Sequence, residues 1–416
     1  MADKKLTADW LADVAVQQVF DLLGNDGEEV WAVGGAVRNT LLSVGVKDID
    51  FATTCTPDVM LARARAAEVK AVPTGIDHGT ITLVIGKKTF EVTTLRSDVA
   101  TDGRHAQVVF TRNMAEDASR RDFTINALYV DRDGTLLDPC DGLRDIDPVV
   151  IRFIGDAEAR IQEDYLRSLR FYRFFAWFGQ FRPDAAGIKA TAKLKAGLDQ
   201  LSAERIWQEM SRLLAAPDPS RALLWMRQAG VLTAVLPESE NWGIDEIHGL
   251  IAAEQALGWL PDAVLRLMAV VPSNEERMAA LAKRWKLSNS VRDRLLAWAT
   301  QPDIAPTIDD GAFARLLYRH NQQAIIDTLR LDVAKRRARQ SSDFTAMGEL
   351  ARMTMLLEKA VDWKRPVLPV SGQDFAVRGY EQGKALGEAL KALEDEWVAS
   401  GFSLTRDALL SKIAKP

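Results

Sequence analysis

The first 150 residues mix short apolar runs with segments in which apolar and polar residues alternate. Residues 30–33 are all apolar and predict a short buried strand, and residues 48–53 predict a second strand. The glycine pair between them favours a turn that leads into a helix over residues 36–43. Residues 78–85 and 88–95 are rich in β-branched side chains and flank a Gly-Lys pair, which predicts a hairpin.

From Asp156 onward, apolar residues recur at helical spacing, and short breaks at proline and glycine separate the segments. Neither strand-like alternation nor a repeat of fixed length is evident in this part of the sequence. The pattern predicts an α+β multidomain protein. We expect a mixed-sheet head over residues 1–150, an all-α neck over 151–215, and a helical body and tail over 216–416.

Composition narrows the class of protein. No apolar run is long enough to span a membrane, and the N-terminus lacks the apolar core of a signal peptide, so we expect a cytoplasmic protein. The two cysteines, Cys55 and Cys140, lack the spacing of metal ligands. The net charge is −5, with 16 basic against 24 acidic residues in 1–150 and 37 against 34 in the remainder. Binding to RNA would therefore depend on local basic patches outside the acidic head.

The first candidate site is the Gly-Gly-x-Val-Arg turn after the first predicted strand. Gly34 and Gly35 have no Cβ atoms that would keep a phosphate away, and the following helix offers free backbone N–H groups to an anion. Arg38 lies in the first turn of that helix and can add paired hydrogen bonds to the same phosphates. Taken alone, such a glycine pair also fits a plain turn that binds no phosphate.

An Asp-x-Asp pair follows on the second predicted strand. Asp48 and Asp50 lie two residues apart, so the two carboxylates would face the same side of the sheet and suit Mg²⁺. Glu91 in the next predicted hairpin is a third candidate, either as a metal ligand or as an exposed-face residue. With the glycine turn upstream, the pair indicates nucleotidyl transfer. In that reaction two metal ions activate the attacking hydroxyl and steady the leaving pyrophosphate.

Two further segments carry charge in a suggestive pattern. The segment RRDFTINA at residues 120–127 supplies arginines suited to a triphosphate and an acid suited to a ribose hydroxyl. The alternative is a helix end whose charges pair with one another. In EDYLRSLRFYRF, residues 163–174, Asp164, Arg167 and Arg170 share a helical face, and Arg173 continues the row. A surface salt-bridge ladder is the alternative, but the excess of arginines over nearby acids favours binding.

Eight ordered segments together match a known family. They are GGAVR (34–38), DID (48–50), HGTITLV (78–84), FEVTTLR (90–96), TDGRHAQVVFTRN (101–113), RRDFTINAL (120–128), LDPCDGLRDI (137–146) and RIQEDYLRSLRFYRF (160–174). The chain resembles the class II tRNA nucleotidyltransferases, or CCA-adding enzymes, within the polymerase-β-like superfamily that includes bacterial poly(A) polymerases. Weaker agreement continues through LSAERIWQEMSRLL (201–214), so the match covers about the first half of the chain.

The resemblance implies a role for each matched residue. The catalytic carboxylates that would hold Mg²⁺ are Asp48, Asp50 and Glu91. The residues that would bind the incoming nucleotide are Gly34, Gly35, Arg38, Arg121, Asp122, Asn126, Asp164, Arg167, Arg170 and Arg173. Where the family usually has Asp, this chain has Asn39, which keeps the hydrogen-bond acceptor and loses the charge.

Asp164 and Arg167 would act as a protein template for the base. Cytosine and adenine both present an amine donor beside a ring-nitrogen acceptor, whereas uracil and guanine present a carbonyl beside an N–H. A carboxylate and a guanidinium side by side therefore accept C and A and repel U and G.

The segment SDVATDGRHAQVV, residues 97–109, has no apolar periodicity and is interpreted as a mobile loop. A passive surface connection is the alternative. The resemblance implies that this loop helps one site change from CTP to ATP, with Asp102 and Arg104 as its working charges.

The expected function is template-independent addition of C, C and A to the 3′ end of tRNA from CTP and ATP, with release of pyrophosphate. A poly(A) polymerase, an enzyme that adds only CC or only A, and an inactive RNA-binding protein are the alternatives. Neither a membrane nor a stable protein partner is implied.

Overall fold

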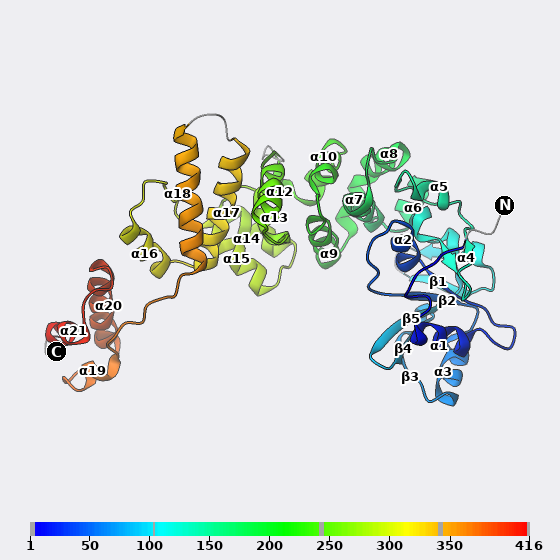
Figure 1. The fold of residues 1–416 in the computed structure, drawn as a ribbon, viewed down its shortest axis with the longest axis horizontal. Coiled ribbons are helices and arrows are strands. Elements are labelled where there is room, and N and C mark those ends of the chain that lie inside the picture. Colours follow the sequence, from blue (N-terminus) through cyan, green and yellow to red (C-terminus); the bar gives the residue numbers. More distant parts are fainter. Residues whose placement is uncertain (1–4, 103–104, 241–244, 340–343, 414–416) are drawn as a thin grey trace. The chain divides into compact units, whose positions relative to one another are not determined.

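A computed structural model describes residues 5–102, 105–240, 245–339 and 344–413. The chain divides into two compact units, Met1–Pro237 and Glu238–Pro416, which Figure 1 traces by colour. The predicted head and neck both lie in the first unit, together with residues 216–237 of the predicted body.

A seven-stranded mixed sheet forms the centre of the first unit, in the order β3-β4-β5-β2-β1-β8-β9. Its strands are β1 (Val30–Val33), β2 (Asp50–Thr53), β3 (Lys70–Gly75), β4 (Thr80–Ile85), β5 (Lys88–Thr94), β8 (Tyr129–Val130) and β9 (Leu136–Leu137). β2 and β5 pair in parallel, and the other pairs are antiparallel. The mixed sheet and the β4–β5 hairpin are thus confirmed.

Both faces of this sheet are covered. The helices of this region are α1 (Val14–Leu23), α2 (Gly35–Leu41), α3 (Pro57–Ala66), α4 (Met114–Ser119) and α5 (Leu143–Ile146). On one face, Phe51 of β2 meets Phe20 of α1 and Phe90 of β5 edge to face. On the other face, a second buried cluster includes Trp31, Ala118 of α4 and Tyr129.

Helices make up the remainder of the first unit. They are α6 (Ala157–Glu163), α7 (Leu166–Phe178), α8 (Ala185–Leu194), α9 (Ala203–Leu214), α10 (Ser220–Gln228) and α11 (Val231–Val235). Phe123, from the RRDFTINA segment, is fully buried against the rings of Phe153, Phe171 and Phe174. This aromatic contact fixes α7 to the sheet-bearing part of the unit.

All the secondary structure described in the second unit is helical, as the periodicity predicts. Its helices are α12 (Asp245–Leu257), α13 (Ala263–Val270), α14 (Glu275–Arg284), α15 (Asn289–Ala299), α16 (Asp310–Arg319), α17 (Gln322–Ala338), α18 (Phe344–Val361), α19 (Gly372–Ala376), α20 (Lys384–Ala399) and α21 (Arg406–Lys412). A buried ion pair joins Arg266 to Glu254, with an N–O distance of 2.6 Å. Among the described residues, no helix has the length and hydropathy needed to cross a bilayer.

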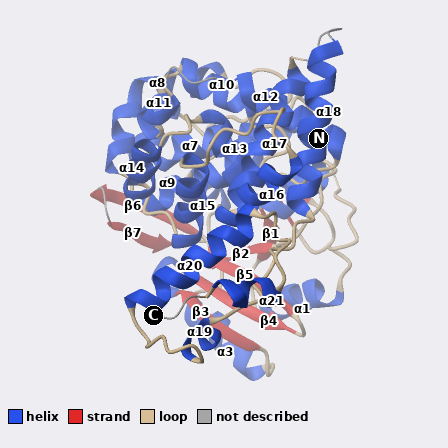
Figure 2. Ribbon diagram, turned by 90° about the vertical axis from the view of Figure 1, so that its left-hand side faces the viewer, coloured by secondary structure: helices blue, strands red, loops and turns tan. Residues whose placement is uncertain are grey.

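Two predictions of local structure are wrong. Strand β2 begins at Asp50 and not at Asp48, because its partner β1 ends at Val33, where Gly34 turns the chain away with φ +71°. Residues 97–109 are not a loop: β6 (Arg96–Asp102) and β7 (His105–Phe110) form an antiparallel hairpin separate from the main sheet (Figure 2).

Candidate nucleotide-binding site

A pocket of about 410 Å³ opens in the first unit, and its walls come from α2, β2, α7, α9 and the segment after α4. The residues that line it are Gly34, Gly35, Arg38, Asp50, Arg121, Asp122, Asn126, Asp164, Leu166, Arg167, Arg170, Phe174 and Arg205. The structure thus brings together most of the site residues expected from the sequence. Three of the expected residues, Asp48, Glu91 and Arg173, do not line this pocket.

Gly34 forms the turn between β1 and α2. Its φ of +71° lies in the region that glycine tolerates best. A Cβ atom here would lie 3.5 Å from the carbonyl oxygen of Asn126 and 3.7 Å from a guanidinium nitrogen of Arg121. Gly35 is not part of this turn, because it is already the first residue of α2.

Arg38 is a buried cation that contacts only neutral hydrogen-bond partners among the described residues. Its guanidinium donates to the side-chain oxygen of Asn126, and Nε and Nη2 donate to Asn39 Oδ1 at 3.1 and 2.7 Å. It also lies over the rings of Phe174 and Phe178, at 5.1 and 4.5 Å from their centroids. Burial lowers the pKa of Arg38 to about 10, so it stays charged at neutral pH. An unpaired buried cation of this kind favours an anionic ligand.

Asn39, at the position where the resemblance leads one to expect Asp, contacts both Arg38 and the chain after α2. Its Oδ1 accepts the two Arg38 hydrogen bonds, and its Nδ2 donates to the carbonyl oxygen of Gly45 at 3.1 Å. Asn39 therefore acts as a neutral acceptor for the Arg38 guanidinium.

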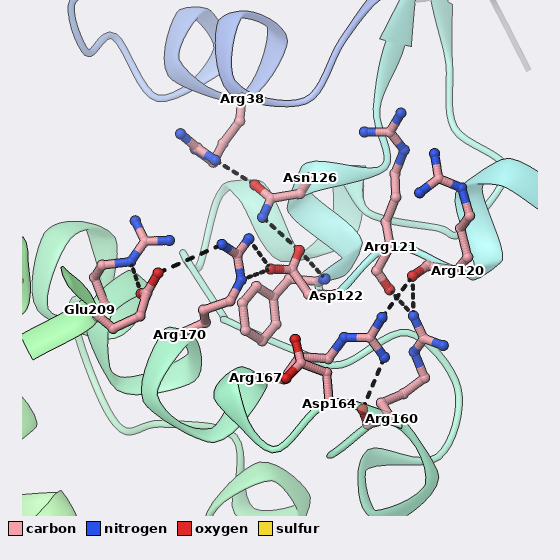
Figure 3. A network of polar contacts seen from close by, with 12 residues as sticks. Arg38, Arg120, Arg121, Asp122, Asn126, Arg160, Asp164, Arg167, Arg170 and Glu209 are labelled. Atoms are coloured by element: carbon pink, nitrogen blue, oxygen red, sulfur yellow. Dashed lines mark hydrogen bonds and ion pairs between the residues drawn. The ribbon is translucent and has the colours of Figure 1, made fainter. Parts of the chain in front are cut away.

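Asp122 links the segment after α4 to helix α7 (Figure 3). Its Oδ2 accepts from Arg170 Nε at 2.7 Å, and its Oδ1 accepts from Asn126 Nδ2 at 3.0 Å. Burial alone would raise the pKa of Asp122, but the charge of Arg170 and these hydrogen bonds hold it below its usual value. Asp122 is thus an ionised bridge whose chain of contacts reaches Arg38 through Asn126.

Asp117 is a buried acid that organises the two arginines of the RRD segment. Its Oδ1 accepts from Arg120 Nη2 at 2.6 Å, and its Oδ2 accepts from Arg121 Nη2 at 3.0 Å and from the Tyr129 hydroxyl at 2.8 Å. It also accepts from the backbone N–H of Arg96, at the start of β6. The sequence analysis missed Asp117, although an acid three and four residues before two arginines on a helix is a recognisable pairing signal.

The candidate metal ligands lie at the edge of the pocket. Asp50 is paired with Glu91 in the parallel register of β2 and β5, so both side chains project from the same face. Although Asp50 remains exposed to solvent, partial desolvation and then the charges of Glu91 and Asp48 raise its pKa to about 6. A divalent cation would offset this mutual repulsion, and carboxylate oxygens are ligands that Mg²⁺ prefers.

Asp48 is exposed and precedes β2, so strand geometry does not place it beside Asp50 as predicted. In the described ranges, no three His, Cys, Asp or Glu side chains form a group that could hold a metal ion.

The two expected template residues lie at the start of α7, but not on one helical face. Asp164 has extended backbone angles between α6 and α7, because the helix begins only at Leu166. Its Oδ1 accepts from the backbone N–H of Leu166 at 3.1 Å, and its Oδ2 accepts from Arg205 Nη2 at 2.7 Å. The prediction that Asp164 shares a helical face with Arg167 and Arg170 is therefore wrong.

Carboxylates from elsewhere in the unit pair with the arginines of α7. Arg167 pairs with Glu163, Arg170 with Asp122, and Arg173 with Glu209. The interpretation of an arginine row without enough acids is therefore wrong. Glu209, the partner of Arg173, is buried on α9, 36 residues later in the sequence. Local sequence spacing could not reveal this pair.

The sequence analysis also missed Arg205, which lines the pocket from α9. It lies in segment 201–214, where the family match is weaker. Of the two expected loop residues, Asp102 ends β6 and its side chain is not described, and Arg104 lies outside the described residues.

Two family models match the chain. The model described as "Poly A polymerase head domain" matches residues 30–152, and the one described as "Probable RNA and SrmB- binding site of polymerase A" matches residues 180–242. These matches cover the sheet-bearing region and the helices from α8 to α11.

Similar proteins cover nearly the whole chain. The mitochondrial CCA tRNA nucleotidyltransferase 1 of Mus musculus is 34% identical over 406 residues, which are 96% of this chain and 90% of that protein. The CCA-adding enzyme of Leuconostoc mesenteroides is 30% identical over 408 residues, which are 97% and 96% of the two chains. The crystal structure of the Bacillus stearothermophilus CCA-adding enzyme in complex with CTP is 26% identical, with a TM-score of 0.74 and 96% of each chain covered. A Thermotoga maritima CCA-adding enzyme complexed with tRNA shares the fold at 20% identity, with a TM-score of 0.67 over 99% and 98% of the chains.

Proposed function

Because the chain belongs to the family of CCA-adding tRNA nucleotidyltransferases, we propose that it adds C, C and A to the 3′ end of tRNA from CTP and ATP. One observation carries this proposal: a single pocket combines the buried, unpaired Arg38, the carboxylate of Asp50 and the pair of Asp164 and Arg167. These groups suit a triphosphate, a metal-assisted displacement and a base edge, respectively. The related structure with bound CTP supports the same ligand class.

The chain's own side chains would divide the nucleotide among them. Arg38 and Arg121 would bind the triphosphate; Gly34 leaves room beside the guanidinium of Arg121, and Gly35 leaves room beside that of Arg38. Asp122 would contact the ribose while Arg170 keeps it ionised. Bound Mg²⁺ would neutralise charge on the phosphates and increase the nucleophilicity of the tRNA hydroxyl. Asp50 and Glu91, which project from one face of the sheet, and the neighbouring Asp48 would have to move together to hold it, with pyrophosphate as the second product.

Asp164 and Arg167 would select the base. The carboxylate of Asp164 accepts from the exocyclic amine of C or A, and the guanidinium of Arg167 donates to the adjacent ring nitrogen. Arg167 is held for this task by the carbonyl oxygens of Arg160 at 2.9 Å and Arg120 at 3.1 Å. A carbonyl of U or G would face Asp164 and be repelled.

The test is to incubate the protein with tRNA that lacks its 3′ CCA, supply each triphosphate alone and in combination, and size the products. We expect two additions with CTP alone and a third when ATP is also present. Repeated addition of A with ATP alone would instead identify a poly(A) polymerase. A product that stops after CC with both triphosphates present would identify a CC-adding enzyme. Addition only to tRNA that already ends in CC would identify an A-adding enzyme.

A further inference from the structure

The two side chains proposed to read the base are fixed by different parts of the unit. Arg167 is held from α6 and from the RRD segment, through Glu163 and two backbone carbonyl groups. Asp164 is held from α9: among the described residues, Arg205 supplies the one side-chain hydrogen bond that Asp164 accepts. Arg205 itself lines the pocket.

Helix α9 is well placed for this role because it presents two charged residues, four apart, to the neighbourhood of α7. Arg205 donates to Asp164 at 2.7 Å, and Glu209, one turn later, accepts from Arg173 at 2.5 Å. The buried Glu209 contact sets the register of the two helices, so the position of Arg205 beside the N-terminal end of α7 follows from it.

The geometry leaves Asp164 able to bind a base. A carboxylate has about four lone-pair sites, and the described hydrogen bonds from Leu166 and Arg205 use only two of them. Without Arg205, the carboxylate would lose this restraint and could turn toward Arg167, the first arginine after it in the chain. Such a pair would occupy both groups that read the base.

From this geometry we infer that Arg205 is a specificity-determining positioning residue, which holds the Asp164 carboxylate toward the pocket and away from Arg167. The inference rests on the proposed function, since it assigns a partner to the base-reading carboxylate. The ion pair is not a major source of fold stability, because the Arg205 side chain is 47% exposed and such pairs contribute little. A variant at this position is therefore expected to fold.

The test compares kcat/KM for single additions of CTP and UTP, and of ATP and GTP, to matched tRNA ends. Each preference is a ratio within one preparation, so the fraction of folded enzyme cancels. We expect Arg205→Met to lower both preferences roughly tenfold, the order that one weakened base contact carries. Arg205→Lys should lower the two preferences less, because it keeps a cation at this position.

Arg212→Met is the matched control, because Arg212 is an exposed residue of the same helix and does not line the pocket. Its preferences should equal those of the wild-type protein. If Arg205→Met also keeps the wild-type preferences, the inference is wrong while the proposed function stands. A wild-type protein that adds no CTP to tRNA would overturn the proposed function, and the inference with it.

A double-mutant cycle separates positioning from direct contact with the substrate. If Arg205 acts through Asp164, Arg205→Met should change neither preference in an Asp164→Ala background. A further tenfold loss in that background would show that Arg205 contacts the nucleotide itself, and would overturn the positioning role.

Discussion

At the scale of single residues, the carboxylates near the start of β2 repel one another. Asp50 faces Glu91 in register, and its pKa is raised to about 6 by desolvation and by the neighbouring acids. Such an arrangement opposes folding unless a cation offsets it, so its presence beside the pocket is better explained by metal binding than by stability.

We predict that Asp48→Ala or Asp50→Ala abolishes nucleotide incorporation while tRNA binding stays near normal, because only metal binding is lost. Glu91→Gln should reduce nucleotide incorporation less. Single-turnover incorporation and a tRNA gel-shift assay would measure the two effects. Asp133→Ala, at an exposed acid in the β8–β9 turn, serves as the control. Substantial turnover by Asp48→Ala would contradict the metal assignment.

A second prediction concerns Asp164. Replacing it with Ala should permit misincorporation of UTP and GTP, because each lost base contact contributes about 1–3 kcal/mol to discrimination. Competition between CTP and UTP for the same tRNA end would measure the change. If the variant loses rate but keeps its full preference, base selection depends on other residues.

Which residues could be predicted from the sequence depends on where their partners lie. The glycine turn, the DxD pair and the RRD segment were identified because their chemistry is contained within a few residues. Glu209 and Arg205 were missed because each pairs with a residue at least 36 positions away. Only packing of α9 against α7 creates those pairs, and no local pattern encodes that packing.

At the scale of elements, helix α8 packs unusually close to α7. A Cβ atom on Gly187 would lie 2.6 Å from a ring carbon of Phe171, and that ring is fully buried against Phe123 and Phe153. Rings on its other sides restrict how far it can move. This glycine therefore sets the distance between the two helices.

We predict that Gly187→Ala lowers the free energy of unfolding of the first unit by about 1–3 kcal/mol, the usual cost of overpacking a core. Calorimetric unfolding would measure the shift. Gly45→Ala is a suitable control, since an added Cβ there meets nothing within 4 Å. Equal stability of the two variants would show that α8 can move away from α7 at little cost.

The β6–β7 hairpin shows why the predicted loop was wrong. The segment carries Val99, Val108 and Val109, β-branched residues that favour strands even where apolar periodicity is absent. The base of the hairpin is fixed to the main sheet: Thr111 donates its backbone N–H to Leu95 at 2.9 Å, and Arg112 pairs with Glu28 at 2.9 Å.

We predict that shortening residues 100–106 leaves CC addition largely intact and selectively slows addition of the terminal A. The base contacts persist in such a variant, so the sheet should be unaffected. Rates of C and A addition to tRNA ends of the matching length would test this. Equal loss of both rates would show that the hairpin has a purely structural role.

At the scale of the whole molecule, the division at Pro237 places every pocket-lining residue in the first unit. No described residue of the second unit lines this pocket. We therefore expect the first unit to bind the nucleotide without the second unit. The helical character of the second unit followed from periodicity, whereas the division at Pro237 depends on which helices pack together.

We predict that a fragment of residues 1–237 binds CTP with an affinity close to that of the full chain but does not extend tRNA efficiently. Calorimetric titration with CTP and a primer-extension assay would measure the two properties. Loss of CTP binding in a folded fragment would show that the second unit contributes to the pocket.

The contact of Arg38 with Phe174 and Phe178 limits how this protein could be recombined with its relatives. The guanidinium that would hold the triphosphate rests on two rings of α7, the helix that carries Arg167 of the proposed base-reading pair. A chimera joined between the sheet-bearing region and α7 would separate this cation from its aromatic support and Asp122 from Arg170. Exchange between homologues should therefore succeed only when the junction lies beyond α9, so that the first 214 residues are inherited as one block.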